Sequence, residues 1–423
     1  MSADNVSTDT LLADLTALAA RARAASRRLA AATTARKNGA LLAIADALVS
    51  QTAAILAANQ RDLAAAEGIS AAMLDRLRLT PERIKAVADG VANVAGLPDP
   101  VGVLLREWTR PNGLRILKHS VPIGVIGIIY ESRPNVTADA ASLCLKAGNA
   151  TVLRGGSEAF HSNTAIVAAM DAALAAHGFA DAVTFVPTTA REAIPVLCSL
   201  EQHIDLIIPR GGHGLISTVV QHARMPVIKH YTGICHVFVH RDADFDMAEK
   251  IILNAKCQRP SACNAMETLL VDKAAAGKFL PRIVAALRAK NVEIRTDDET
   301  RSLFPDLKSA AAAEWDTEYL DFILNLRVVD GTAGALAHIS AHGSQHSDAI
   351  VTANAAEAEH FLNAVDSATV YWNASTRFTD GGEFGFGAEI GISTGKLHAR
   401  GPMGLEELTS YKYQIIGDGQ VRA

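Results

Sequence analysis

The hydrophobic residues of the chain follow different periods in different regions. Residues 11–66 are rich in Ala, and Leu and basic residues recur there at helical spacing, which predicts two long helices. From Val121 onward, short apolar runs alternate with helical stretches, and the same alternation resumes after Cys263. Strands that alternate with helices indicate βαβ units and a parallel sheet. We therefore predict an α/β fold with two parallel-sheet domains.

The pattern predicts the elements of both regions individually. In the first region the strands are 121–130, 150–153, 183–186 and 204–208, and the helices are 136–147, 157–177, 191–200 and 215–222. In the second region the strands are 266–271, 291–295, 322–329 and 347–351, and the helices are 273–289, 331–341 and 354–364. The boundary is expected near residue 255. A cleft between two such domains is where a cofactor and a substrate would meet.

Two other segments have the pattern of antiparallel strands. Residues 106–120 predict a hairpin whose turn is Pro111-Asn112-Gly113. Tyr411–Ile416 is a candidate edge strand, and it follows a glycine-rich segment at 380–387.

Composition excludes several classes of protein. A chain of 423 residues is too long for one simple core and is expected to form two or three domains. A net charge of −5 and a pI near 6.3 argue against general nucleic-acid binding. The longest apolar run, 121–130, is about half as long as a membrane-spanning helix, and no secretory signal pattern opens the sequence. Five scattered cysteines without a CxxC pair suggest reduced thiols, so we expect a cytoplasmic protein.

One cysteine lies among residues that would leave its thiol accessible. Cys263 occurs in the run Gln258-Arg259-Pro260-Ser261-Ala262-Cys263-Asn264-Ala265, whose members are small, polar or helix-breaking. A thiolate at this position could form a thioester with a carbonyl carbon. Lys256 and Arg259 are close in sequence, and nearby cations lower the pKa of a thiol.

The residues alone leave a second cysteine open as the nucleophile. Cys257 lies beside Lys256 and shares the same cations. Cys144 and Cys198 lie on predicted helices and Cys235 in a strand, where free cysteines are usually buried and inert. The choice of nucleophile therefore lies between Cys263 and Cys257.

A candidate oxyanion donor follows the first apolar strand. Asn135 ends the segment Glu131-Ser132-Arg133-Pro134-Asn135, where an Asn after Pro could simply be a turn residue. This segment leaves the carboxyl end of a strand in a parallel sheet, which is where ligands bind. The Asn135 amide could thus stabilise an oxyanion together with the backbone N–H of Cys263.

Two glycine-rich loops are candidates for holding a nucleotide. Arg154-Gly155-Gly156-Ser157-Glu158 and Arg210-Gly211-Gly212-His213-Gly214 each follow a predicted strand and open a helix. Helix N-termini bind phosphate, and an arginine there favours NADP over NAD. Neither loop contains G-x-G-x-x-G, and glycine-rich turns of this kind are also ordinary architecture.

The histidines do not predict a metal site. His338, His342 and His346 are spaced by four, as on one helix face. However, Gly343 and Ser344 are expected to break that helix, and no carboxylate or cysteine completes a ligand set. We therefore expect no bound metal.

Taken in order, these motifs resemble the aldehyde dehydrogenase superfamily. The resemblance is carried by the apolar strand, Pro134-Asn135, Leu145-Lys146-Ala147-Gly148-Asn149, the loop that begins at Arg154, and the later cysteine. Within the superfamily, longer runs resemble the gamma-glutamyl phosphate reductases of proline biosynthesis. These runs are 130–135, 254–260, 373–394 and 401–408. The similarity extends over essentially the whole chain after the first helix.

The resemblance implies an aldehyde dehydrogenase-like organisation of three parts. Residues 1–105 and 121–255 would form a Rossmann-like NADP-binding domain, and 256–395 the catalytic domain. Residues 106–120 and 396–423 would form a small β arm for homo-oligomerisation, as a dimer or tetramer.

The resemblance also implies roles for individual residues. Cys263 corresponds to the family nucleophile, whereas Cys257 does not, and Asn135 corresponds to the oxyanion asparagine. Arg154 stands where many relatives have a lysine that holds the cofactor ribose or 2′-phosphate. Glu318 stands where relatives carry a glutamate that contacts the nicotinamide ribose. The remaining cofactor candidates are Gly155, Ser157, Glu158, Arg210, Gly211 and Gly212.

One departure from the hydrolytic members of the superfamily has a chemical meaning. Those enzymes carry a glutamate before a Leu-Gly-Gly sequence, and it activates the water that cleaves the thioester. The corresponding residues here are His230-Tyr231-Thr232-Gly233, without that glutamate. We expect His230 and His236, which flank this turn, to be structural or to lie at the cleft wall. A reductase has no need of an activated water.

The activity implied by the resemblance is NADPH-dependent reduction of L-glutamyl 5-phosphate to L-glutamate 5-semialdehyde, through a Cys263 thioester and with release of phosphate. This is the second step of proline biosynthesis from glutamate, so glutamate 5-kinase is a channelling partner to consider. Because the substrate is anionic, Arg133, Arg259 and Arg377 are candidates for holding its phosphate or α-carboxylate. The alternatives are a hydrolytic aldehyde dehydrogenase and a catalytically silent nucleotide-binding protein.

Overall fold

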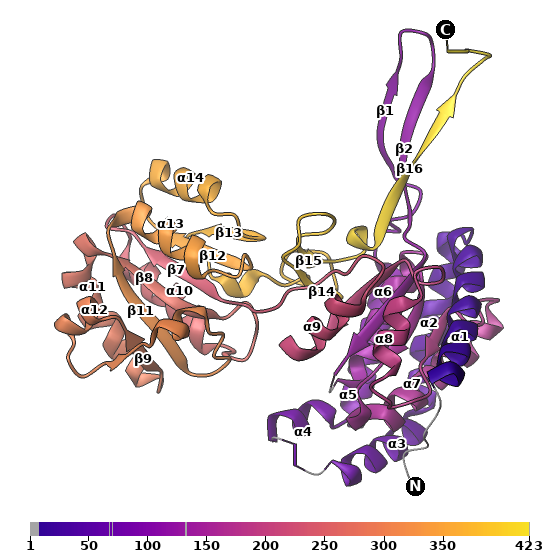
Figure 1. Cartoon of the computed structure of the whole chain (residues 1–423), viewed down its shortest axis with the longest axis horizontal. Coiled ribbons are helices and arrows are strands. Elements are labelled where there is room, and N and C mark those ends of the chain that lie inside the picture. Colours follow the sequence, from indigo (N-terminus) through magenta and orange to yellow (C-terminus); the bar gives the residue numbers. More distant parts are fainter. Residues whose placement is uncertain (1–7, 67, 70, 132, 423) are drawn as a thin grey trace. The chain divides into compact units, whose positions relative to one another are not determined.

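The computed structural model describes residues 8–66, 68–69, 71–131 and 133–422. The chain forms two compact units (Figure 1). Unit 1 comprises Met1–Lys229, Gly385–Gly391 and Met403–Ala423, and unit 2 comprises His230–Phe384 and Ile392–Pro402. The division after Lys229 differs from the boundary near residue 255 that the sequence predicts. The reason is that β7 (Cys235–Val239) and α10 (Phe245–Cys257) pair and pack with the second sheet.

The N-terminal part of unit 1 is entirely helical. Its helices are α1 (Thr8–Ala30), α2 (Thr34–Ser50), α3 (Thr52–Ala65), α4 (Ala71–Leu77) and α5 (Pro81–Gly96). The prediction of two long helices over residues 11–66 is wrong, because there are three. The Thr33 hydroxyl caps the start of α2, and the chain bends by 66° at Gln51 between α2 and α3. Helices α4 and α5 were not predicted.

The core of unit 1 is a four-stranded parallel sheet with the order β5-β4-β3-β6. The strands are β3 (Val125–Tyr130), β4 (Ala150–Arg154), β5 (Val183–Phe185) and β6 (Leu206–Arg210). They alternate with α6 (Pro134–Lys146), η1 (Ser157–Ala159) with α7 (Phe160–Ala176), α8 (Ala193–Ser199) and α9 (His213–His222). The strand order reverses between β3 and β6. The carboxyl ends of the strands at such a reversal form a ligand-binding crevice.

The predicted strand 121–130 is divided in two by a corner. Strand β2 (Arg115–Pro122) ends before it and β3 begins after it, with Gly124 at φ +133°. A Cβ at Gly124 would overlap the carboxylate of Asp205, which accepts the backbone N–H of Val125 at 2.7 Å. Only glycine fits this conformation and this close approach.

An antiparallel arm of three strands belongs to unit 1. It has the order β1-β2-β16, formed by β1 (Leu104–Thr109), β2 and β16 (Thr409–Ile416), and it projects from the body of the unit (Figure 1). Gly113 adopts φ +89° in the turn of the hairpin. The predicted hairpin and the predicted C-terminal edge strand are both confirmed.

Unit 2 is built on a seven-stranded parallel sheet with the order β10-β9-β11-β8-β7-β12-β13. Besides β7, its strands are β8 (Met266–Asp272), β9 (Glu293–Thr296), β10 (Lys308–Ser309), β11 (Ile323–Val329), β12 (Ser347–Val351) and β13 (Thr369–Trp372). Besides α10, its helices are α11 (Lys273–Ala289), α12 (Asp298–Leu303), α13 (Gly331–His342), α14 (Ala355–Ala364), η2 (Ala312–Asp316) and η3 (Thr376–Phe378). Two short strands, β14 (Gly391–Ser393) and β15 (Gly401–Met403), pair with each other, and η4 (Glu406–Leu408) precedes β16. The strands and helices predicted after Cys263 are confirmed to within a few residues.

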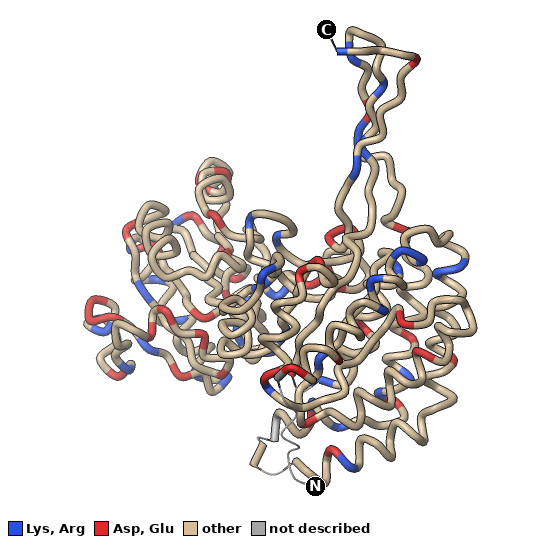
Figure 2. Tube along the Cα trace, turned by 45° about the vertical axis from the view of Figure 1, so that its right-hand side comes forward, with Lys and Arg blue, Asp and Glu red and all other residues tan. Residues whose placement is uncertain are grey.

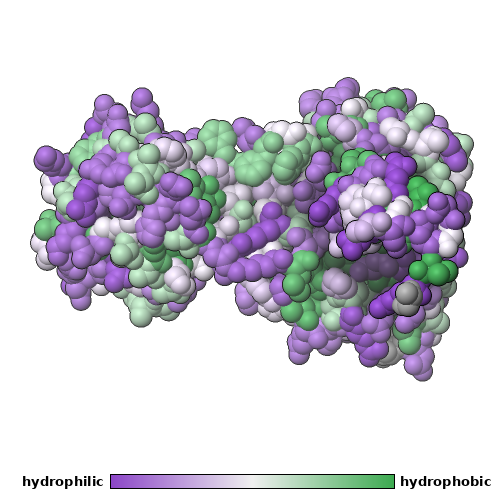
Figure 3. All heavy atoms as spheres, turned by 90° about the horizontal axis from the view of Figure 1, so that it is seen from above, coloured by the Kyte–Doolittle hydropathy of each residue, from purple (hydrophilic) through white to green (hydrophobic). Residues whose placement is uncertain are grey.

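Charged residues of both signs are interspersed along the trace of each unit (Figure 2). On the face seen in Figure 3, hydrophilic residues surround smaller hydrophobic groups. Within the described part of the chain, no single helix is long and apolar enough to cross a membrane. The bent pair α2 and α3 passes that test only when the two helices are taken together.

Candidate active site

The backbone of Cys263 is fixed by hydrogen bonds from both sides. Cys263 is half-buried in the loop between α10 and β8. The side-chain amide of Asn264 donates to the carbonyl of Thr379 at 2.8 Å, and the Thr376 hydroxyl donates to the carbonyl of Asn264 at 2.7 Å. The thiol of Cys235 donates to the Cys263 carbonyl at 3.4 Å. The loop therefore presents its thiol from a rigid support.

A glycine allows this loop to approach strand β7. A Cβ at Gly233 would overlap the carbonyl oxygen of Cys263, so no other residue fits without moving the loop. The backbone N–H of Gly233 donates to the carboxylate of Glu318. The turn before β7 therefore connects the candidate nucleophile to a candidate cofactor residue.

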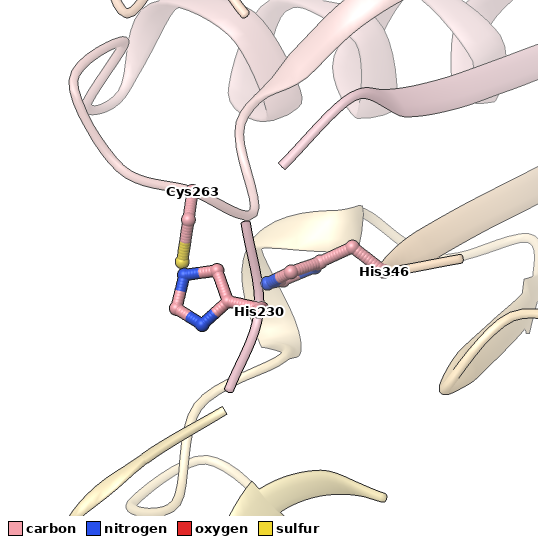
Figure 4. A group of neighbouring side chains, drawn as sticks. All are labelled: His230, Cys263 and His346. Carbon is pink, nitrogen blue, oxygen red and sulfur yellow. The ribbon is translucent and has the colours of Figure 1, made fainter. Parts of the chain in front are cut away.

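Two histidines lie beside the thiol of Cys263 (Figure 4). Atom Nε2 of His230 lies against the sulfur, and the outer nitrogen of the His346 ring points toward His230. One ring nitrogen of each and the sulfur all lie within 4.8 Å of one another. Atom Nδ1 of His230 lies 2.9 Å from the carbonyl of Ile392, to which it can only donate. Neutral His230 therefore carries its lone pair on Nε2, facing the sulfur.

The structure locates the His230 ring more closely than the sequence predicts. A role at the cleft wall or in the structure was expected, and the structure places the ring at the thiol. The signal in the sequence was its position, because His230 opens the turn where hydrolytic aldehyde dehydrogenases carry their glutamate. His236, by contrast, is buried in β7 and pairs with Asp348 at 2.8 Å, as a structural residue would.

His346 is separated from the histidines with which its spacing grouped it. Helix α13 ends at His342 and Gly343 follows as its C-cap, so the predicted helix break is confirmed. The buried His346 ring lies 5.6 Å from that of His230 between ring centroids. Burial, together with the repulsion that a protonated His230 would exert, lowers the pKa of His346 to about 3, so the His346 ring is neutral. The three residues of the 338-342-346 series do not form one ligand set.

The other cysteines are poorer nucleophile candidates than Cys263. Cys257 is the last residue of α10, packs against the apolar core of unit 2, and has its pKa raised by burial. Cys144, Cys198 and Cys235 are buried as predicted, and burial raises the pKa of each thiol. Of the two cysteines that the sequence left open, Cys263 is the one with imidazole nitrogens beside its sulfur.

Two of the three predicted anion-binding arginines belong to the surroundings of Cys263. Burial lowers the pKa of Arg377, the charge of Arg259 adds to this effect, and a negative Cys263 sulfur opposes it. Atom Nε of Arg377 donates to Oε1 of Gln258 at 3.0 Å. The third candidate, Arg133, belongs to unit 1, where it is exposed at the N-cap of α6.

A buried ion pair lies behind the loop and was missed by sequence reasoning. Atom Nζ of Lys256 lies 2.8 Å from Oε2 of Glu267, and both side chains are fully buried. The other oxygen of Glu267 accepts the backbone N–H of Leu320 at 3.2 Å. Burial raises the pKa of both Glu267 and Glu318, and the charge of Lys256 opposes both shifts. No hydrophobic pattern marks two charged residues as core residues.

Asn135 lies on the first turn of helix α6, whereas the sequence predicted it in a loop. Pro134 occupies the first helical position, which its fixed φ favours, so the helix begins earlier than expected. The Asn135 amide donates one hydrogen to Oδ2 of Asp139 at 2.8 Å, and burial raises the pKa of Asp139 to about 6. An amide has two hydrogens, so one remains for a substrate oxygen. Ser132, in the same segment, lies outside the described residues.

Several cofactor candidates gather at the carboxyl edge of the four-stranded sheet. Arg154 ends β4, and its Nη2 donates to the carbonyl of Thr189 at 3.2 Å. Burial lowers the pKa of Arg154, and the charges of Glu158 and Glu131 oppose this. The buried Nε of Arg154 has no hydrogen-bond partner among the described residues. An unsatisfied donor at this edge fits a phosphate or hydroxyl oxygen of a bound dinucleotide.

Internal carboxylates occupy the helix N-termini that the sequence offered to phosphate. Asp62 accepts the backbone N–H groups of His161 at 3.0 Å and Ser162 at 2.7 Å, in the first turn of α7. Glu131 accepts the N–H of Gly212 at 2.9 Å, directly before α9. These particular N–H groups are therefore satisfied by carboxylates of the chain itself, and phosphate binding at the two loops stays a prediction.

The glycines of the two loops also serve packing. A Cβ at Gly155 would overlap the amide of Asn163, and one at Gly211 would overlap the carboxylate of Glu131. The Arg210 guanidinium packs against Gly391, where a Cβ would overlap it. Ser157 is exposed at the start of η1, so its hydroxyl remains accessible.

The family to which these features belong is shown by comparison with known proteins. The model of the aldehyde dehydrogenase family matches residues 7–319. The chain belongs to this family. Its members use a nicotinamide cofactor, and the chain is accordingly an oxidoreductase.

Within the aldehyde dehydrogenase family, the chain groups with the gamma-glutamyl phosphate reductases. It is 56% identical over 405 residues to that of Moorella thermoacetica, covering 95% of this chain and 97% of the relative. It is 54% identical over 416 residues to that of Geobacter metallireducens, covering 98% of this chain and 100% of the relative. The predicted resemblance is confirmed.

Solved structures confirm the predicted fold class. The crystal structure of gamma-glutamyl phosphate reductase from Thermotoga maritima matches with a TM-score of 0.95 and 46% identity, covering 97% of this chain and 100% of that one. An acetylating aldehyde dehydrogenase from Geobacillus thermoglucosidasius matches with a TM-score of 0.70 at 17% identity, covering 98% and 99%. The second match shows the common fold alone.

Proposed function

We propose that the chain reduces L-glutamyl 5-phosphate to L-glutamate 5-semialdehyde with NADPH and releases phosphate, as the second step of proline biosynthesis from glutamate. Relatives that are more than half identical over nearly the whole length are gamma-glutamyl phosphate reductases. The observation that carries the proposal is the Cys263 thiol, which is half-buried beside an imidazole acceptor and within the electrostatic reach of the half-buried Arg377.

The first step is transfer of the glutamyl group to sulfur. The Cys263 thiol gives its proton to Nε2 of His230, and the thiolate attacks the acyl carbon of the substrate. The carbon–oxygen bond to phosphate breaks, and the phosphate leaves with the electron pair of that bond. Arg259 and Arg377, together with Arg133, are proposed to hold the phosphate and the α-carboxylate, since guanidinium groups pair bidentately with both anions.

The tetrahedral intermediate carries a negative oxygen, and preorganised donors stabilise it. The backbone N–H of Cys263 is one proposed donor, and its loop is held by the bonds of Asn264. Asn135 is proposed as the second donor, oriented by Asp139. Both donors would act again when the thioester carbon becomes tetrahedral a second time, before the carbon–sulfur bond breaks and frees the semialdehyde.

The cofactor residues are proposed from the carboxyl edge of the sheet in unit 1 and from the Gly233–Glu318 contact in unit 2. Arg154 would hold the ribose or the 2′-phosphate, which is the basis for preferring NADPH to NADH. When bound, the dinucleotide supplies a hydride. The other residues proposed to hold it are Gly155, Ser157, Glu158, Arg210, Gly211, Gly212 and Glu318.

Each of the three parts of the chain is proposed to have its own role. Unit 1 would bind the cofactor, unit 2 would provide Cys263, and the arm would join copies of the chain into a dimer or tetramer. Strand β16 lies at the edge of the arm and exposes about half or more of Tyr411, Tyr413, Ile415 and Ile416. An unpaired edge with apolar side chains is suited to pairing with a second copy. We also propose that the protein is cytoplasmic and that glutamate 5-kinase passes L-glutamyl 5-phosphate to it by channelling.

The reverse reaction tests the function directly. With L-glutamate 5-semialdehyde as substrate, we expect NADP to be reduced only when inorganic phosphate is present, because phosphate must resolve the thioester. A hydrolytic aldehyde dehydrogenase would reduce the cofactor without phosphate. Equal rates with and without phosphate would overturn the proposed reaction. A clear preference for NAD over NADP would overturn the proposed choice of cofactor.

Replacing Asn135 by alanine is expected to lower kcat by about 10²–10³-fold, the usual loss when one oxyanion donor is removed. The KM for the substrate should change much less, since the amide acts on the charge that develops during reaction. Asn93→Ala, on the exposed face of α5 in the same unit, is the matched control and should retain full activity. A kcat for Asn135→Ala within a few-fold of the wild type would rule out the oxyanion role.

A further inference from the structure

We infer that Cys263, His230 and His346 form a binding site for a thiophilic divalent cation such as Zn²⁺, and that the bound ion reversibly blocks the thiol. The three side chains come from three separate segments of unit 2 and converge on one point (Figure 4). Their ligand atoms lie within 4.8 Å of one another. They are the one group of three potential ligands found among the described residues.

The distances fit a tetrahedral ion after small side-chain rotations. Zinc bonds of about 2.3 Å to sulfur and about 2.1 Å to imidazole nitrogen separate the ligand atoms by roughly 3.4 to 3.6 Å. The residue types also fit, because a thiolate and two imidazoles are preferred ligands of Zn²⁺. Three protein ligands leave the fourth position for water, and the half-buried Cys263 gives the ion a path from solvent.

The ring nitrogens are already oriented as in metal sites. A histidine ligand usually donates its second ring N–H to a carbonyl or another polar group, which fixes its tautomer. His230 does this through Nδ1 to the carbonyl of Ile392 at 2.9 Å. Its Nε2 therefore carries the lone pair on the side of the sulfur, so metal binding requires no change of tautomer at His230.

His346 supplies an independent observation that points to a ligand. The ring is fully buried, and its Nε2 has no hydrogen-bond partner among the described residues. Its Nδ1 lies 2.8 Å from the hydroxyl of Ser347 and 3.6 Å from the sulfur of Cys235. The Cys235 thiol donates its hydrogen to the Cys263 carbonyl, so its sulfur can only accept from Nδ1–H. The Nε2 of His346 is thus a buried lone pair, and a metal ion would satisfy it.

Binding should change the chemistry of Cys263. A thiolate bound to Zn²⁺ shares a lone pair and negative charge with the metal, so it should attack a substrate or an alkylating reagent more slowly than the free thiolate. The inhibition of the reductase rests on the proposed nucleophilic role of Cys263, whereas the binding itself does not. Activity and occupancy are therefore measured separately.

The binding test uses the full-length reduced chain with Co²⁺ as a spectroscopic probe. We expect a thiolate-to-cobalt charge-transfer band in the near ultraviolet and visible bands of tetrahedral intensity, both removed by excess Zn²⁺. X-ray absorption at the zinc edge should show one sulfur and two imidazole nitrogens. A spectrum without the charge-transfer band, or a zinc ion without sulfur or with one imidazole, would overturn the site, and neither measurement depends on a variant.

Variants then assign the ligands. His346→Asn keeps an amide donor near the position of Nδ1 but removes the Nε2 ligand, so it should weaken Zn²⁺ binding by about 100-fold or more. His338→Asn removes another buried histidine of unit 2 and should leave Zn²⁺ affinity unchanged, as should Cys257→Ser. Equal Zn²⁺ affinity of His346→Asn and the wild type would refute the three-ligand site.

The inhibition test completes the design. Micromolar Zn²⁺ should slow both the reductase and the alkylation of Cys263 by iodoacetamide, and a chelator should restore both. If cobalt binds with the expected spectrum but the chain shows no phosphate-dependent reductase activity, the metal site stands and the proposed function fails. If the reductase is active and insensitive to Zn²⁺ although the cobalt charge-transfer band is present, the site stands and the proposed inhibition is refuted.

Discussion

Replacing Cys263 by alanine is expected to abolish the phosphate-dependent reduction of NADP, with a fall in kcat of about 10⁴-fold or more. The reason is that removal of a covalent nucleophile leaves only binding and the oxyanion donors, which together recover a small part of the rate. The half-buried position should tolerate alanine, so the thermal unfolding of the variant should match that of the wild type.

Cys257→Ala is the matched control for this experiment, because Cys257 lies in the same segment and was the alternative nucleophile by sequence alone. It should retain near wild-type kcat. Mass spectrometry during turnover should find the glutamyl thioester on the peptide that contains residue 263. If Cys257→Ala lost activity and Cys263→Ala retained it, the assignment of the nucleophile would be reversed.

The second large effect is expected on stability, from the buried pair of Lys256 and Glu267. Replacing Lys256 by methionine should lower the free energy of unfolding by about 3–5 kcal/mol, because it leaves the fully buried Glu267 carboxylate without its cation. Chemical denaturation followed by circular dichroism measures this loss. Lys250→Met, on the exposed face of the same helix α10, should change stability by no more than about 0.5 kcal/mol.

The loss in Lys256→Met should depend on pH with a definite sign. Burial raises the pKa of Glu267 above that of a free carboxyl, and removing Lys256 raises it further. A carboxyl with a higher pKa in the folded than in the unfolded state contributes stability at low pH and loses it as the pH rises through the folded value. The variant should therefore be more destabilised at about pH 8 than at about pH 5 relative to the wild type.

A double variant separates the unpaired charge from other causes. Lys256→Met with Glu267→Gln removes both charges and keeps an oxygen that can accept the N–H of Leu320. It should recover most of the stability, because replacing both members of a buried pair by neutral groups is often nearly neutral. A double variant as unstable as Lys256→Met alone would show that the methionine does not fit the core.

Most elements were predictable where the pattern was strong and local. The strands and helices after Cys263 follow from alternating apolar runs, and the arm hairpin follows from Pro111-Asn112-Gly113. The errors occurred at boundaries that depend on distant residues. The corner at Gly124 exists because Asp205 lies against it, and the true unit boundary exists because β7 pairs with β8 and β12.

The candidate site was predictable in part for the same reason. Motifs around Asn135 and Cys263 mark both residues as candidates, because the roles proposed for them depend on short continuous sequences, and those roles stay predictions. The Lys256–Glu267 pair could not be predicted, since a charged residue is expected at the surface unless a partner is known to be buried with it. The carboxylates of Asp62 and Glu131 were likewise not foreseen at the helix N-termini that they occupy.

The sequence by itself determined the α/β class, the family, and the identity of Cys263 as the nucleophile candidate, since these depend on periodicity and on local motifs. Only the tertiary structure decided that His230 and His346 meet at that thiol and that their Nε2 atoms face it. The turn before β7, the loop before β8 and the start of β12 are far apart along the chain. They come together because parallel strands that are neighbours in a sheet align the same ends, and the strand order is fixed by long-range pairing.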